Sequence, residues 1–159
     1  MKYKNQLVVF NDYIRLIEDD LKTKAPKFTG NLVNSIVGTV DMKEENPSFG
    51  FDYLEYGDFL DQGVNGTEIN WGSPYSFGEK MPPIKSLSSW ANAYNINPFA
   101  LAKSIQKKGI KPRNFTSNVD NLINQFADEY VVAYWEDYAD EENEKGKKNS
   151  KKVKKNRKK

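Results

Sequence analysis

The stretch VGTVDMKEENPSFGFDY, Val37 to Tyr53, decides the fold class. Two short segments within it, residues 37–40 and 49–53, alternate loosely between apolar and other residues, and the polar turn KEENPS separates them. Alternation with a period of two residues is typical of a strand with one buried face. We therefore predict a β-hairpin at this point in the chain.

Helical periodicity dominates the sequence on both sides of the hairpin. Apolar residues at alternating spacings of three and four predict an amphipathic helix over residues 3–24. Two middle helices are predicted over residues 82–95 and 98–109, the second one capped by Asn97. A further apolar stripe predicts a long helix from residue 119 to about 138. That stripe consists of Val119, Leu122, Ile123, Phe126, Tyr130, Val131 and Tyr134.

We therefore predict an α+β fold in which a small antiparallel β-sheet packs with an N-terminal helix, two middle helices and a long C-terminal helix. A disordered basic tail is expected to follow. Residues 145–159 hold ten basic side chains and no acidic one, which leaves 24 − 10 = 14 basic against 22 acidic side chains in residues 1–144. Such charge runs repel themselves and bury little apolar surface. We accordingly divide the chain into a single α+β domain, residues 1–141, and a Lys-rich tail, residues 142–159.

The composition excludes several classes of protein. The chain has no cysteine and no histidine, so it can form neither disulfides nor catalytic devices that need Cys or His. No apolar run approaches the roughly 20 residues of a membrane helix, and the first residues do not form a secretory signal, which favours the cytoplasm. An enzyme would have to use carboxylates such as Glu55, Asp58 and Asp61, which are more simply interpreted as a solvated acidic face.

A long segment without periodicity, residues 63–83, is rich in Gly, Asn, Pro and aromatic residues. Long loops of this kind are uncommon inside compact domains and tend to be functional. One interpretation is a surface loop folded over its own hydrophobic side chains. We favour the other, an arm that docks on a neighbouring subunit and is ordered by assembly, because aromatic residues anchor interfaces. The expected interface residues are Trp71, Tyr75, Phe77 and Met81.

Four stretches, in order, resemble one family. They are APKFTGNLVNSI (Ala25–Ile36), EYGDFLDQGVNGT (Glu55–Thr67), MPPIKSLSSWA (Met81–Ala91) and LAKSIQKKGIKPRNF (Leu101–Phe115). Together they are similar to the neck and tail-completion proteins of tailed bacteriophages, small virion proteins that sit between the portal and the tail. The resemblance covers roughly residues 25–116 and leaves out the Lys-rich tail.

This resemblance implies a structural protein of the head–tail connector, assembled into a ring through which DNA passes. It implies no enzymatic activity and no cofactor. The implied partners are copies of the chain itself and other neck, portal-adaptor or tail proteins, with no membrane. The implied location is the neck of the virion, after synthesis in the cytoplasm of a bacterial host.

Two charged regions are further candidate contacts. Lys111 and Arg113 could contact acidic neighbours or DNA in a ring, or belong to a simple connection between helices. The basic tail could contact packaged DNA or an acidic partner through counterion release, or serve only as a solubilising terminus. Its candidate residues are Lys147, Lys148, Lys151, Lys152, Lys154, Lys155 and Arg157. A small nucleic-acid-binding accessory protein, acting through this tail, is the alternative function.

Overall fold

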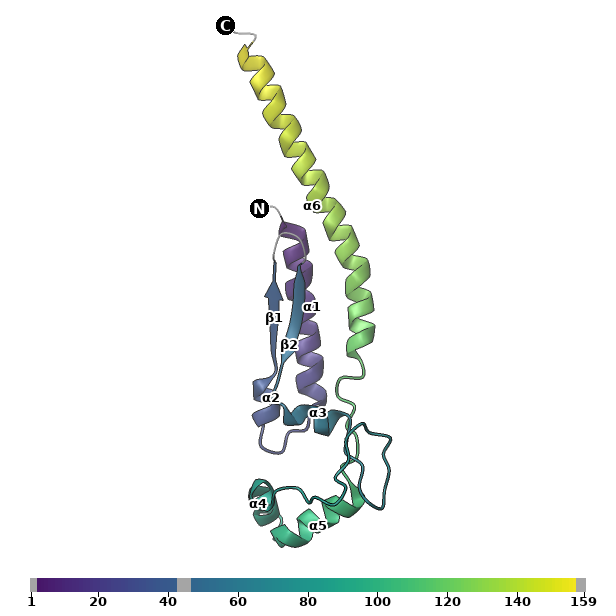
Figure 1. Ribbon diagram of the computed structural model, residues 1–159. Coiled ribbons are helices and arrows are strands. Elements are labelled where there is room, and N and C mark those ends of the chain that lie inside the picture. Colours follow the sequence, from purple (N-terminus) through teal and green to yellow (C-terminus); the bar gives the residue numbers. More distant parts are fainter. Residues whose placement is uncertain (1–2, 43–46, 157–159) are drawn as a thin grey trace. The chain divides into compact units, whose positions relative to one another are not determined.

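The computed structural model describes residues 3–42 and 47–156, with side chains described up to residue 151, and Figure 1 shows its elements in chain order. The α+β prediction is confirmed: the described residues form helices and one two-stranded antiparallel sheet. The elements are α1 (Lys4–Lys24), α2 (Asn31–Ser35), β1 (Val37–Asp41), β2 (Ser48–Asp52), α3 (Tyr56–Asp61), α4 (Ile84–Ala93), α5 (Pro98–Lys108) and α6 (Val119–Asn156).

The chain divides into two compact units, each assembled from separate segments of the sequence. Unit 1 comprises residues 1–20, 37–52 and 118–159, and unit 2 comprises residues 21–36 and 53–117. Unit 1 therefore contains most of α1, the hairpin and α6, while unit 2 contains the short helices and the long loop. The predicted boundary after residue 141 stays a prediction.

The predicted hairpin is confirmed, and its register shows which face is buried. Val40 pairs with Phe49 and Gly38 pairs with Phe51, so all four residues lie on the face that packs on α1. A Cβ atom at Gly38 would lie 2.5 Å from Cγ2 of Ile14. The missing side chain at residue 38 therefore allows the strand to approach α1 closely.

The core of unit 1 is aromatic. Phe10 of α1 is 2% exposed and lies 5.7 Å from Phe49 of β2 and 5.0 Å from Phe126 of α6, measured between ring centroids. Tyr130 of α6 closes the cluster at 5.4 Å from Phe10. Edge-to-face pairs of this kind add about 0.5–1.5 kcal/mol each beyond the burial of area. These rings hold α1, the hairpin and the first half of α6 together around one hydrophobic core.

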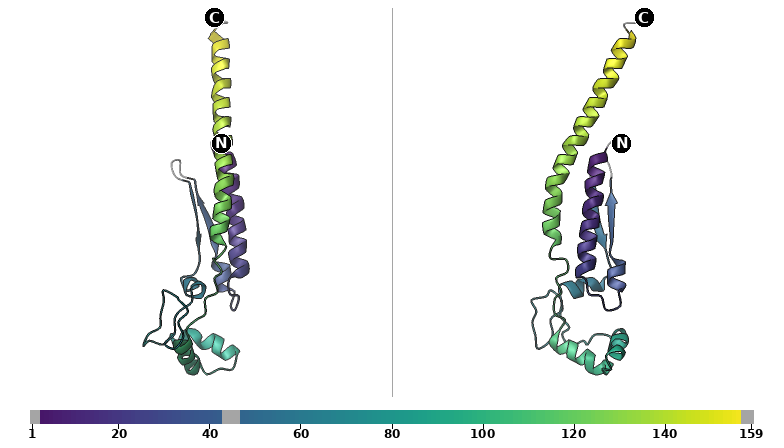
Figure 2. Two further views of the ribbon diagram at one scale, coloured as in Figure 1. Left: turned by 90° about the vertical axis from the view of Figure 1, so that its right-hand side faces the viewer. Right: turned by 180° about the vertical axis from the view of Figure 1, so that it is seen from behind.

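A carboxylate of α6 caps α1. Asp137 accepts hydrogen bonds from the backbone N–H groups of Asn5 (2.9 Å) and Gln6 (3.0 Å) and from Nε2 of Gln6 (3.2 Å). The first N–H groups of a helix have no partner within the helix, and a negative charge there is favourable. Asp137 thereby fixes the N-terminus of α1 beside α6, which runs along α1 in every view (Figure 2).

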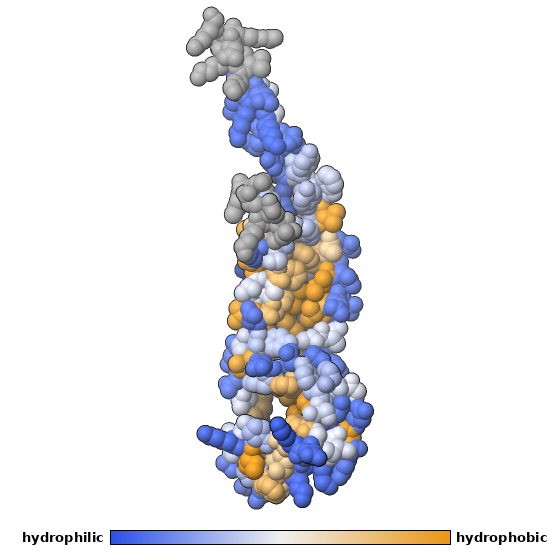
Figure 3. Space-filling view, viewed as in Figure 1, coloured by the Kyte–Doolittle hydropathy of each residue, from blue (hydrophilic) through white to orange (hydrophobic). Residues whose placement is uncertain are grey.

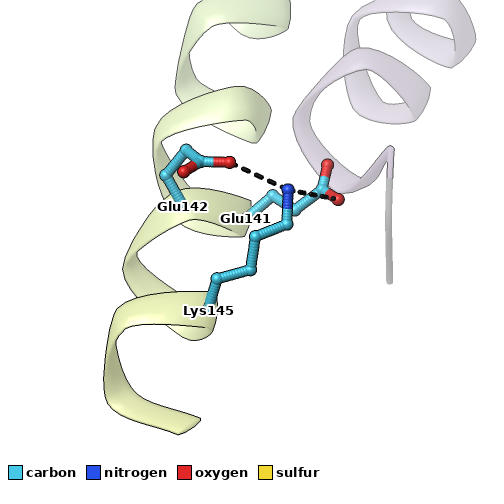
Figure 4. Close-up of polar contacts among 3 residues, drawn as sticks. All are labelled: Glu141, Glu142 and Lys145. Atoms are coloured by element: carbon cyan, nitrogen blue, oxygen red, sulfur yellow. Dashed lines mark hydrogen bonds and ion pairs between the residues drawn. The ribbon is translucent and has the colours of Figure 1, made fainter. Parts of the chain in front are cut away.

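Helix α6 is longer than the sequence pattern indicated. It was expected to end near Tyr138 and to be followed by a disordered tail, but it continues to Asn156. Lys145 pairs with Glu141 (3.3 Å) and Glu142 (2.8 Å), as Figure 4 shows, and Lys147 pairs with Glu144 (3.5 Å). Acidic residues placed one turn before lysines stabilise a helix, and lysines near its C-terminus interact favourably with its dipole. The prediction of disorder is therefore wrong for residues 142–156, and Arg157 lies outside the described residues.

Unit 2 is built from short helices with well-formed ends. The side chain of Asn97 caps α5 as predicted, accepting bonds from the N–H groups of Phe99 (2.9 Å) and Ala100 (3.2 Å). Helix α4 packs against α5, and Trp90 of α4 lies 6.3 Å from the ring of Phe28. Residues 56–61 form the short helix α3, in which Gly57 and Asp61 are buried.

Candidate interaction surfaces

The long loop of unit 2 is organised by one side chain, Asn65. Its Oδ1 accepts hydrogen bonds from the backbone N–H groups of Trp71 (2.8 Å) and Ser73 (3.1 Å), and its Nδ2 donates to the Ser73 carbonyl (2.7 Å). Its backbone N–H donates to the Tyr75 carbonyl (2.8 Å), and its carbonyl accepts from the N–H of Phe77 (3.1 Å). Five hydrogen bonds from a single residue thus hold the loop folded back on itself.

The base of the loop is held against the end of α5 by a close contact between glycines. Gly109 has a φ of 72°, which glycine adopts without strain, and a Cβ atom there would lie 2.1 Å from the Val64 carbonyl oxygen. A Cβ atom at Gly66 would lie 2.2 Å from the Lys107 carbonyl oxygen. The two chain segments can lie this close only because both positions lack side chains.

The aromatic residues expected to form a docking arm have partners within unit 2. Trp71 donates from Nε1 to the Lys108 carbonyl (2.8 Å), and the ring of Tyr75 lies 4.6 Å from that of Phe59 in α3. Trp71, Tyr75 and Phe77 are half-buried, whereas Met81 is exposed. The loop is therefore ordered within the chain, and the expectation that it is ordered by assembly is wrong. Their participation in an oligomer interface stays a prediction.

Beside Tyr75 and Phe77 lies an apolar hollow of unit 2, a groove of about 520 Å³. Pro82, Pro83 and the start of α4 supply one part of its wall, called the lip, and α3 and the long loop supply other parts. We call it the unit 2 groove. Its lining consists of Tyr56, Phe59, Leu60, Val64, Tyr75, Ser76, Phe77, Pro82, Pro83, Ser86, Leu87 and Ile110. Such a surface accepts apolar side chains and offers few hydrogen-bonding groups.

Lys111 and Arg113 lie on the connection that follows α5, and both are exposed. The backbone of this connection is fixed: the N–H of Arg113 donates to the Leu60 carbonyl (2.9 Å), and Ile110 forms an isolated bridge with Val64. Lys111 and Arg113 therefore belong to a segment with a fixed backbone that begins next to Ile110, a residue of the unit 2 groove.

A second apolar surface lies on α6 in unit 1, and the sequence pattern had concealed it. Leu122 and Phe126 of the predicted stripe are buried, but Val131 (53% exposed) and Tyr134 (47%) face solvent. Trp135 (60% exposed) and Tyr138 (51%) lie beside them. We call these last four residues the aromatic strip: Val131, Tyr134, Trp135 and Tyr138. The residues of the predicted single stripe thus lie on two faces of the helix. One face packs on α1, and the other faces solvent in unit 1.

The C-terminal part of α6 is mostly charged or polar, and Figure 3 shows its hydrophilic surface. Lys147, Lys148 and Lys151 are exposed on the helix. With a rotation of about 100° per residue, positions 147, 148, 151, 152, 154 and 155 fall on one face spanning roughly 160°. Positions 146, 149, 150 and 153, which are Gly, Asn, Ser and Val, fall on the other face. The helix therefore gathers lysine positions that a disordered tail would have left dispersed.

Two of the three carboxylates considered for catalysis, Asp58 and Asp61, have separate structural partners. Asp58 accepts a hydrogen bond from the hydroxyl of Tyr53 (2.7 Å), and burial together with this bond raises the pKa of that tyrosine well above its usual value. Asp61 is buried and accepts from the backbone N–H of Thr116 (3.0 Å). Glu55 is exposed. Over residues 3–42 and 47–156, no group of three acidic side chains is arranged to hold a metal ion.

Within the described part of the chain, none of the helices combines the length and the apolar character needed to cross a membrane. No protein-family model, curated protein or solved structure matches the chain.

Proposed function

We propose that this protein is a structural subunit of a ring in the neck of a tailed bacteriophage, acting in head–tail connection or tail completion. The observation that carries the proposal is the presence of two different apolar surfaces, the unit 2 groove and the aromatic strip. A ring built from identical subunits needs a head-to-tail contact, in which two different patches on each subunit meet. A symmetric dimer needs only one patch.

The resemblance to neck proteins supports the same proposal, because the stretches that carry it lie together in one part of the fold. All four stretches that carry it, residues 25–36, 55–67, 81–91 and 101–115, fall within unit 2. They supply α2, α3, α4 and α5, the base of the long loop and part of the groove. The resemblance thus coincides with one compact unit of the structure.

The proposal is tested on purified phage particles from the source lysate. Quantitative mass spectrometry should find the chain at a fixed ratio to the portal protein, near equality or one half. Absence of the chain from particles that contain their portal and tail proteins would refute the neck function. A variable, sub-stoichiometric amount would equally refute a ring.

The lysine face of α6 favours a second candidate function, sequence-independent contact with nucleic acid. A helical row of cations lies along a phosphate backbone with less loss of conformational freedom than a disordered tail. Binding of a labelled DNA duplex should then weaken steeply with salt, with about one unit of logarithmic slope for each phosphate neutralised.

Deletion of residues 145–159 tests this candidate, because the deletion removes ten basic side chains while leaving the aromatic core of unit 1 intact. It should abolish the salt-dependent binding. A matched control replaces Lys103 and Lys108 of α5 by glutamine, which should leave the binding nearly unchanged. Equal binding by the deleted and full-length chains would refute this function.

A further inference from the structure

We propose that the aromatic strip of one copy docks in the unit 2 groove of a second copy, which gives a head-to-tail contact that can be repeated. The inference rests on the proposed function, since it names the two surfaces that a ring of this chain would bring together. The sequence patterns indicated Tyr75 and Phe77 as interface residues and placed Val131 and Tyr134 in one helical stripe, but they did not pair the two surfaces.

The geometry of the strip is that of a helix presented to a groove. Its four residues fall within about 100° of the helix circumference, turned by about 130° from the buried stripe that contains Phe126 and Asp137. Val131 and Tyr138 are seven residues apart, which places their Cα atoms about 10 Å from each other along the axis. Anchors at positions i, i+3, i+4 and i+7 are characteristic of helices that bind in apolar grooves.

The strip is also stiffened before binding. The ring of Trp135 lies 5.6 Å from that of Tyr134 and 5.9 Å from that of Tyr138, both in edge-to-face geometry. These rings therefore occupy limited orientations on a helix that is anchored to α1 through Asp137. Binding of a preordered surface loses less side-chain entropy than binding of a flexible one.

The groove matches the strip in chemical character. Prolines 82 and 83 and the rings of Phe59, Tyr75 and Phe77 offer flat apolar surfaces for aromatic side chains. The long loop carries four of these five groups, and the hydrogen bonds of Asn65 fix the part of it that holds Tyr75 and Phe77, so the groove exists without a partner. An aromatic side chain that packs against aromatic rings and prolines is shielded from water, and anchor residues bind most strongly where water is excluded.

Charge complementarity identifies a second copy as the occupant. Residues 128–144 of α6, which flank and contain the strip, hold eight acidic side chains and no basic one. Residues 21–36 and 53–117, which form unit 2, hold ten basic and five acidic side chains, a net charge of 10 − 5 = +5. An acidic helix is therefore attracted to unit 2 of another copy, whereas contacts between like units are disfavoured.

The contact should be weak when formed once. Aromatic side chains bury about 150–250 Å² each, so the strip and the groove together would bury on the order of 1,000 Å². This area is at the lower limit of specific interfaces. A closed ring, in which each subunit makes the contact twice, would hold together far better than an isolated pair.

Two single variants of the full-length chain test the proposal. Trp135→Gln removes the largest anchor of the strip at an exposed helical position, and Ser86→Glu places a negative charge on the exposed lip of the groove. Sedimentation velocity over a concentration series up to about 1 mM, where even a weak Kd is measurable, gives the self-association constant. Far-UV circular dichroism verifies that each variant is folded.

Each variant has a matched control on the same helix. Val132→Gln changes an equally exposed apolar residue of α6 that lies over a different hollow, beside Val8 and Val9 of α1. Asn92→Glu adds the same charge to α4 away from the groove. The test variants should weaken self-association at least 100-fold, and the controls should change it less than threefold.

Mixing the two test variants gives the decisive result. The strip variant retains an intact groove and the groove variant an intact strip, so an equimolar mixture should form dimers that cannot grow further. A mixture that remains monomeric, a wild-type chain that remains monomeric, or greater loss with Val132→Gln than with Trp135→Gln would overturn the proposal. Absence of the chain from phage particles would refute the neck function but would leave a dimer in this mixture, so the two failures are distinguishable.

Discussion

Replacing Asp137 by alanine should destabilise unit 1 strongly, although the residue lies far along α6, near the middle of this long helix. Its carboxylate is 7% exposed and accepts three hydrogen bonds, two from the first backbone N–H groups of α1 and one from the side chain of Gln6. Loss of a helix cap costs about 1–2 kcal/mol. Gln6 is 2% exposed, and leaving its buried Nε2 without an acceptor costs about 1–3 kcal/mol more.

We therefore expect the free energy of unfolding of unit 1 to fall by about 3 kcal/mol in the alanine variant. Asp137→Asn keeps the shape of the side chain but loses its charge and directs an amide toward donors, so about half of that loss is expected. Urea unfolding followed by far-UV circular dichroism measures the free energy. Hydrogen exchange of residues 3–12 shows whether the start of α1 is the part that loosens.

Asp140→Ala is the matched control, because this carboxylate is exposed on the next turn of α6. An exposed substitution of this kind should change stability by less than about 0.5 kcal/mol. If Asp137→Ala were equally mild, or if exchange at the start of α1 stayed at its wild-type rate, the capping argument would be wrong.

Three further predictions, tested with four variants, concern the packing of each unit and the ionisation of Tyr53. Gly38→Ala should lower the free energy of unfolding by about 1–3 kcal/mol through overpacking against α1. Gly50→Ala, whose Cβ atom would have no neighbour closer than 4.0 Å, should be nearly neutral. Thermal unfolding compares the two variants, and equal melting temperatures would contradict the register. Asn65→Ala should expose the long loop to chymotrypsin, and an unchanged cleavage rate would show that other contacts hold it. Because the pKa of Tyr53 is raised in the folded chain, ionisation of Tyr53 favours the unfolded chain. The contribution of this residue to stability is therefore retained below pH 10 and lost above it. Tyr53→Phe should reduce that alkaline loss, as measured by urea unfolding over a series of pH values.

Local signals predicted the elements well. Asn97 caps α5 because an Asn–Pro step satisfies the first turn by itself, and no distant residue can alter that geometry. The hairpin likewise follows from alternation within seventeen residues, Val37 to Tyr53. These features depend on neighbours along the chain, which a sequence displays directly.

Features that depend on distant partners were not predictable in the same way. The periodicity predicted an apolar stripe on α6. It did not separate the face that contacts Phe10 from the face that carries Trp135, because both faces hold aromatic residues. Asn65 drew no attention, since its role arises from bonds to the chain six to twelve residues later. The helical state of the Lys-rich segment depended on Glu–Lys pairs that its net charge concealed.

The interleaved order of the two units has a consequence for synthesis of the chain. Phe10 emerges from the ribosome 126 − 10 = 116 residues before Phe126, the ring that completes its core. At about 5–20 residues per second, Phe10 waits roughly 6–23 s for that partner, and the hairpin, which emerges later, waits a shorter time. During this interval residues 21–36 and 53–117 can already fold, so unit 2 should mature first. The nascent chain therefore exposes the apolar face of α1 while the rest of unit 1 is still being translated, and this interval is when chaperone binding or premature association would act.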